Sequence, residues 1–270
     1  MKPFDLIIGA ALGVGLAACA SVETQDDLAS VADTAPAELV EDSGLDIVVH
    51  EGDFAEIQQF TTPGGVSVWL VSEPSIPILS VAMAWEGGEA ADPEGLEGLA
   101  DAVVYHMNEG AGDLDSLAFQ TRMEDLNMSF GCSASSDWTS CSASMLTDNA
   151  DEAMSLVAQA FEAPRFDAGP FARFQREREV SLNTRETNAR YLAGRAEAQA
   201  IYPDHPYARE TSAESIAALT PELAKAHMRK LMVKDSLIVT AVGAITPEEL
   251  APMLDAIAES LPESNDLPET

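Results

Sequence analysis

Basic residues are scarce in this chain of 270 residues, which has 14 Lys and Arg against 46 Asp and Glu and a formal net charge of −32. A surface this acidic repels the phosphates of nucleic acids, so we do not expect a nucleic-acid partner. We interpret the acidity mainly as a solvated surface, with a specific site for a basic ligand as the alternative. The hydrophobic fraction of 46% is ordinary for a globular protein with a real core.

Several catalytic signatures are also missing. The sequence contains no G-x-S-x-G elbow, no P-loop and no dinucleotide fingerprint, so serine hydrolases and nucleotide-binding enzymes lack a starting residue. Histidine is rare, and His50 and His227 are isolated in the sequence. His205 stands between Pro203 and Pro206, where we expect it to shape a turn.

The first nineteen residues, MKPFDLIIGAALGVGLAAC, contain an apolar run that is too short to span a bilayer comfortably. Such a run after Lys2 is typical of an export signal. Its end, LAAC, resembles the bacterial lipobox, which predicts a lipoprotein signal peptide over 1–19 and a lipid on Cys19. An ordinary cleaved secretory peptide is the alternative. Because Ala20 is not the familiar aspartate retention signal, we expect a lipid-anchored protein of the bacterial envelope, at the periplasmic face of the outer membrane.

Residues 20–56 are acidic, rich in Ala and Ser and nearly free of periodicity, which predicts a tether, followed by a folded domain over 57–270. Apolar alternation and helical spacing in that domain predict an α+β fold. Strands are expected within 58–73, 77–85 and 236–245, a hairpin within 128–146, and helices over 94–109, 115–126, 148–164, 170–202, 213–218, 221–232 and 246–261.

The predicted hairpin contains the two cysteines that remain after Cys19. A two-residue turn at Ser136-Asp137 places Cys132 directly opposite Cys141, in a pair of the closely spaced kind. The same register makes one face of the hairpin mostly apolar and the other mostly serine. An exported protein can oxidise such a pair, so we predict a disulfide, with two small buried thiols as the alternative.

Five segments together resemble the N-terminal half of an insulinase/pitrilysin family subunit, the inverted zinc peptidases of the H-x-x-E-H type. They are, in order, ADPEGLEGLAD, EGAGDLDSLAFQTRMEDLN, SASSDWTSCSAS, APRFD and YPDHPYARETSAESIAALTPELAKAH. The resemblance implies a half-domain with a mostly antiparallel sheet covered by helices. It also implies that two halves make a subunit and that subunits often pair around a peptide chamber.

The zinc motif of that family is degenerate in this chain. In the family, two histidines at i and i+4 bind Zn²⁺ and a glutamate between them activates the metal-bound water. Matching GLADAVVYH to the family pattern puts Asp101 and Tyr105 at the histidine positions and Val104 at the general base. His106 comes one position late and lies about 140° around the helix from Asp101, so the two cannot share a metal without distortion. We therefore expect no catalytic residue and no zinc in this chain.

The distant acidic part of the motif is better matched, because EREVSLNTRE resembles the family's E-R-E-x-x-x-x-x-x-E run. This resemblance places Glu179 at the accessory acid and Glu186 at the third zinc ligand. The alternative, which we favour, is that both belong to a solvated helix face rich in charges.

Two functions remain. By resemblance, the chain is a non-catalytic subunit that binds or positions peptides for a partner with an intact H-x-x-E-H motif, which would carry the zinc. The alternative is a stand-alone surface lipoprotein that binds peptides or another protein without enzymatic activity.

Overall fold

The computed structural model describes residues 44–52, 55–265 and 267. The expected signal peptide, with Cys19, and the first part of the expected tether lie outside these residues. Within the described part of the chain, no helix combines the length and apolarity needed to cross a membrane.

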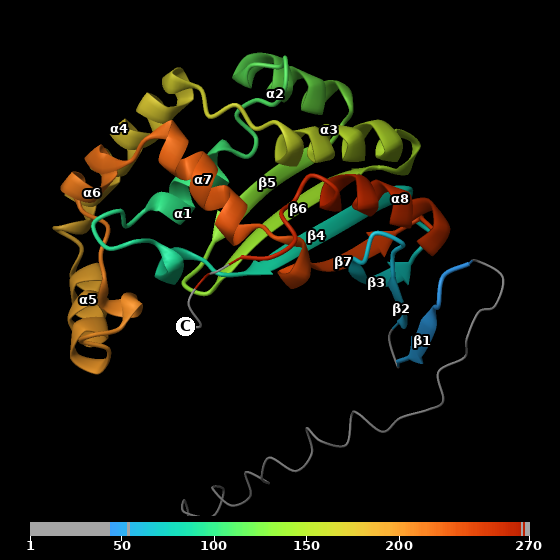
Figure 1. The fold of residues 1–270 in the computed structure, drawn as a ribbon, viewed down its shortest axis with the longest axis horizontal. Helices are drawn as coiled ribbons and strands as arrows, with labels where there is room; N and C mark the ends of the chain where they lie inside the picture. The colour runs from blue at the N-terminus through green and yellow to red at the C-terminus, as the bar shows by residue number, and fades with distance from the viewer. Residues whose placement is uncertain (1–43, 53–54, 266, 268–270) are drawn as a thin grey trace, which may run out of the picture. The chain divides into compact units, whose positions relative to one another are not determined.

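Seven strands form one sheet in the order β1-β2-β3-β7-β4-β6-β5 (Figure 1). All neighbours are antiparallel except β3 and β7, so the predicted mostly antiparallel α+β fold is confirmed. The last strand of the sequence, β7, lies in the middle of the sheet between β3 and β4. The strands are β1 (Val48–Glu51), β2 (Glu56–Thr61), β3 (Ser67–Ser72), β4 (Ile78–Glu86), β5 (Ser129–Ala134), β6 (Trp138–Leu146) and β7 (Ile238–Gly243).

Strand β1 lies inside the segment that was expected to be a tether. Its residues pair with β2 from Val48 opposite Gln59 to Glu51 opposite Glu56, and nearby Ile47 is buried. A strand of four residues is too short to give a clear alternation in an acidic context, which is why the sequence did not reveal it. The folded domain therefore begins before residue 57.

Helices cover one face of the sheet. The helices lie over the sheet in Figure 1. Exposed and buried residues alternate along β7, and along β4 with Ala84 intermediate, as expected for a sheet with one covered face. The helices are α1 (Leu99–His106), α2 (Ser116–Asp125), α3 (Ala150–Glu162), α4 (Ala168–Arg185), α5 (Ala189–Ile201), α6 (Ala213–Ala218), α7 (Pro221–Leu231) and α8 (Pro247–Ala258), with 3-10 turns η2 (Glu89–Ala91), η3 (Thr147–Asn149), η4 (Pro206–Ala208) and η5 (Lys234–Ser236).

The long helical pattern over 170–202 is two helices rather than one. Helix α4 ends at Arg185, and the side chain of Asn188 accepts hydrogen bonds from the backbone N–H groups of Arg190 and Tyr191 to start α5. An Asn that binds the free N–H groups of a following turn is a strong helix start, and it competes with continuation of the preceding helix. The break lets α5 turn away from the line of α4 (Figure 1).

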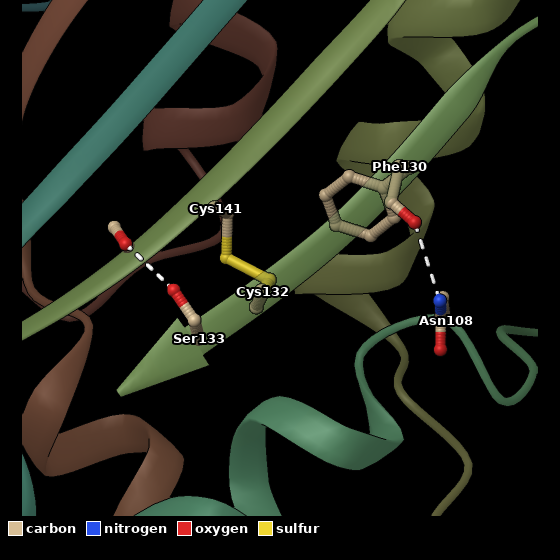
Figure 2. The surroundings of a disulfide bond; sticks show 6 residues. Asn108, Phe130, Cys132, Ser133 and Cys141 are labelled. Atoms are coloured by element: carbon tan, nitrogen blue, oxygen red, sulfur yellow. Dashed lines mark hydrogen bonds between the residues drawn. A yellow bond between two sulfur atoms is a disulfide. The ribbon is translucent and has the colours of Figure 1, made fainter. Parts of the chain in front are cut away.

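The hairpin of β5 and β6 has the predicted register, with Cys132 opposite Cys141 and Phe130 opposite Ala143. The Cα atoms of the two cysteines are 4.0 Å apart, and the structure joins their sulfur atoms in a disulfide (Figure 2). The Asn108 side chain donates to the backbone carbonyl of Phe130 (3.2 Å), which links the hairpin to the loop after α1.

The disulfide can be tested by labelling free thiols in the denatured, unreduced protein. We expect the peptides that contain Cys132 and Cys141 to label only after reduction. Replacing both residues with Ser should lower the free energy of unfolding by roughly 2–3 kcal/mol, because the crosslink restricts the unfolded chain. Labelling of both sulfurs before reduction would show that they are free thiols.

Candidate functional site

The start of α1 is fixed by a buried carboxylate. Asp92 accepts hydrogen bonds from the backbone N–H groups of Gly98 (2.8 Å), Leu99 (3.0 Å) and Ala100 (2.8 Å). A carboxylate here satisfies N–H groups that have no partner inside the helix and is favoured by the helix dipole. Its other neighbour is His227 on α7, whose Nε2 lies 3.2 Å from Asp92 Oδ1, with both side chains almost fully buried.

The loop before α6 closes over the same region. His205 lies in a turn, as expected, where its Nδ1 accepts from the backbone N–H of Tyr207 (3.3 Å). The hydroxyl of Tyr207 donates to Asp137 at the hairpin tip (2.6 Å). Arg209 donates to the backbone carbonyl of Asp92 (2.5 Å), so this loop is tied to the segment that starts α1.

The two former histidine positions of the zinc motif face α4. Asp101 forms a two-pronged ion pair with one edge of the Arg178 guanidinium, with Nη2 2.8 Å from Oδ1 and Nε in contact with Oδ2. Both side chains are about 30% exposed, so water screens this pair only partly. The ion pair raises the pKa of Arg178, and this arginine stays charged.

Tyr105 is held in a second polar contact with α4. Its hydroxyl donates to Glu177 (3.1 Å) and accepts from Nε of Arg173 (3.1 Å). Arg173 also forms an ion pair with Glu109, which follows α1, and its Nη2 lies 2.5 Å from Oε2 of Glu109. Burial raises the pKa of Tyr105, so the phenol stays protonated and acts as a bridge between α1 and α4.

The remaining motif positions do not fit a zinc ion. Val104 is buried with 6% exposure and has no group that could accept a proton. Glu179 is exposed on α4, and Glu186 is exposed just after the end of this helix. Oε1 of Glu186 lies 3.7 Å from Nη1 of Arg195 on α5. Neither glutamate contacts Asp101 or Tyr105 in the described residues, where no cluster of three or more His, Cys, Asp or Glu could hold a metal. Zinc ligation needs several such donors together.

His106 is fully buried and has a structural role. Its Nδ1 donates to the backbone carbonyl of Ala102 (2.7 Å), and its ring stacks on Phe166 and Phe171. Burial lowers the pKa of His106, so the imidazole is neutral. The sequence had placed His106 off the metal-binding face, and the structure puts it among aromatic rings of the core.

The polar partners Arg173 and Arg178 were not identified from the sequence. Asp101 and Arg178 are 77 positions apart in the sequence. Helix α4 carries several arginines, and only the packing of α4 on α1 determines which two of them contact the motif positions. A carboxylate at a former ligand position was the one available signal, because a half-buried Asp requires a cationic or N–H partner.

The family of this chain is shown by its similarity to known proteins. The model of the insulinase family, peptidase family M16, matches residues 67–214, more than half of the chain. The chain belongs to the insulinase family. The predicted resemblance is thus confirmed, and this insulinase-family chain lacks the histidine pair and the glutamate of the H-x-x-E-H motif.

Similar proteins and structures extend this result. The non-peptidase homolog YmxG of Helicobacter pylori is 21% identical over 190 residues, which are 70% of this chain and 44% of that protein. A peptidase M16 inactive domain from Pseudomonas fluorescens matches with a TM-score of 0.74 and 24% identity, over 79% of this chain and 52% of that one. Pitrilysin matches with a TM-score of 0.70 and 18% identity, over 87% and 26%. The chain therefore spans about half the length of the first two proteins and a quarter of the third.

The Asp101–Arg178 ion pair can be measured with a double-mutant cycle that uses Asp101→Asn and Arg178→Gln. We expect each single change to destabilise the fold and a coupling energy of about 1 kcal/mol, because the pair is two-pronged and partly buried. The exposed pair Arg122–Glu152 is the matched control and should give roughly 0.5 kcal/mol or less. Equal coupling in the two cycles, from chemical denaturation, would contradict a special role for Asp101.

Proposed function

We propose that this protein is a non-catalytic insulinase-family subunit that binds and positions peptides for a partner subunit with an intact H-x-x-E-H motif. The observation that carries this proposal is the Asp101–Arg178 ion pair together with the Tyr105 contacts. These contacts occupy the positions that the family uses for zinc, while the fold around them is kept. A surface that keeps its shape without its catalytic residues fits a binding role better than a chemical one.

The edge of the sheet supports peptide binding. Strand β5 is the last strand of the sheet and pairs only with β6 among the described residues, so its outer edge offers backbone groups to an extended peptide, apart from the Phe130 carbonyl, which accepts from Asn108. Helix α1, which carries Asp101 and Tyr105, packs against this strand. A peptide added there would lie along the site where a partner could act on it.

The length of the relatives supports a partner. The chain spans about half the length of the first two proteins it matches, so an assembly of their size has room for a second half or a second subunit beside it. Names of two of these proteins, a non-peptidase homolog and an inactive domain, agree with a role without chemistry in this half. The alternative is a stand-alone surface lipoprotein that binds a peptide or protein and needs no such partner.

Zinc content and hydrolysis together test the role. The purified chain should contain well under one zinc per chain and should not cleave peptides, because a carboxylate, a phenol and a valine cannot replace two imidazoles and a general base. Cleavage should appear when an H-x-x-E-H partner, encoded beside this chain or co-purified with it, is added. A partner whose motif Glu is changed to Gln is the control and should bind without cleaving. Stoichiometric zinc and chelator-sensitive cleavage by this chain alone would contradict the proposal.

We also propose that the mature protein is attached to the envelope by a lipid on Cys19, at the periplasmic face of the outer membrane. The LAAC sequence after an apolar run supports this anchor. Changing Cys19 to Ser should move the protein from the membrane fraction to the soluble periplasm, because stable anchoring of lipoproteins depends on their acyl chains. Unchanged membrane association of the variant, measured by fractionation, would exclude the lipid as the anchor.

A further inference from the structure

A cavity of about 300 Å³ opens beside the Asp101–Arg178 ion pair. Its lining comes from η2, α1, α4, the first turn of α5 and the loop before α6. Its charged residues are Glu89, Asp101, Arg178 and Arg185, and Ser181, Tyr191 and Thr211 add hydroxyl groups. The volume suits one or two amino-acid residues rather than a whole peptide.

Two of the four charges in this cavity cancel. Arg178 donates two hydrogen bonds to Asp101, from Nη2 to Oδ1 (2.8 Å) and from Nε to Oδ2. Arg185 and Glu89 have no ion pair among the described residues. Arg185 lies over the ring of Tyr191, 5.5 Å from its centroid, and a stacked guanidinium keeps its N–H edge available.

The two unpaired groups differ in what they can do without a ligand. A guanidinium keeps its charge in any accessible pH range, so Arg185 needs an anion or water to satisfy it. Glu89 can instead take up a proton. Burial raises the pKa of Glu89, and the nearby carboxylates Asp101 and Asp92 raise it further, while the attraction of Arg185 and Arg178 offsets only part of this rise. The cavity therefore keeps a cation more readily than it keeps the opposing carboxylate.

The surrounding segment is unusual for this acidic protein. Residues 173–209 contain seven Arg against five Asp and Glu, which is half of all the basic residues in the chain. For a carboxylate ligand, attraction by the nearby arginines outweighs repulsion by distant acidic residues, because salt screens charges that are more than about 10 Å away. A carboxylate ligand can thus be attracted here in spite of the net charge of −32.

We propose that this cavity binds a carboxylate of a peptide, with Arg185 as the receiving cation and the hydroxyls of Ser181 and Thr211 as further donors. Both hydroxyl side chains line the same cavity. This inference rests on the proposed function only in taking a peptide as the ligand. The carboxylate can come from a peptide C-terminus or from an Asp or Glu side chain, since both present the same two oxygens to a guanidinium.

The experiment measures binding to the purified full-length chain by calorimetry or NMR titration. The C-terminal arm compares N-acetyl-trialanine as the free acid and as the amide. The side-chain arm compares N-acetyl-Ala-Glu-Ala amide with its Gln counterpart. We expect at least one acid to bind about tenfold more tightly than its neutral match, since one charge-assisted contact is gained. The arm that shows the difference identifies the source of the carboxylate.

Matched variants assign the effect to the cavity. Arg185→Gln should remove the preference for the acid, while Arg190→Gln, which changes an exposed arginine outside the cavity lining, should leave it. Glu89→Gln should tighten binding of the acid several-fold, because it removes the opposing charge. Glu94→Gln, on the exposed loop before α1, should have no effect. Circular dichroism and melting curves establish that each variant is folded.

Several results would overturn the inference. Equal affinity for acids and amides, or no binding of any probe at millimolar concentration, would show that the cavity is no carboxylate site. Weaker binding of the acid after Glu89→Gln would show that Glu89 supports binding of the acid and does not oppose it, which contradicts the assigned roles of the charges. The proposed function fails separately, because it is tested by cleavage with the partner: a chain can support cleavage without any preference for acids, and it can bind acids without supporting cleavage.

Discussion

The buried carboxylate of Asp92 is the constraint on which the arrangement of this site depends. It binds three backbone N–H groups at the start of α1 and lies against His227 of α7, while Arg209 holds its backbone carbonyl. An unpaired carboxylate at this depth would be costly, so all these partners are fixed together. Because the first turn of α1 is fixed, the rotation of the helix is fixed too, and Asp101 and Tyr105 must face α4.

The contact between α1 and α4 involves the positions that match the zinc motif of the family. In a zinc peptidase of this family, ligands from the two helices meet on one ion, whereas here Asp101 meets Arg178 and Tyr105 meets Glu177 and Arg173. These contacts replace a strong crosslink by several weaker polar ones, and packing of aromatic rings around His106 adds to them. These contacts hold α1 and α4 together through groups of the chain itself, and the proposed binding role uses the surface that they shape.

Much of the fold was predictable because local signals were strong. The turn at Ser136-Asp137 sets the register of the hairpin, and Asp115 caps α2 as its side-chain chemistry predicts. Strand β1 was not predicted, because its four residues give too little alternation. The break at Asn188 was not predicted either, because charged residues continue a helical pattern on both sides of it. The site was only half predictable: the loss of the zinc ligands is visible in the sequence, but the arginines that replace them are chosen by packing between segments far apart in the chain.

The central place of β7 in the sheet has a consequence for how the chain acquires its structure. β7 is the only strand that joins the β1-β2-β3 ribbon to the β4-β6-β5 part of the described sheet, and it comes from residues 238–243. Until those residues are available, the two parts have no hydrogen bonds to each other, so the sheet cannot be completed during synthesis of the N-terminal region. Pairings this distant in sequence slow folding through the entropy of loop closure. The sheet should thus remain unfinished, with open strand edges on β3 and β4, until residues 238–243 can take part.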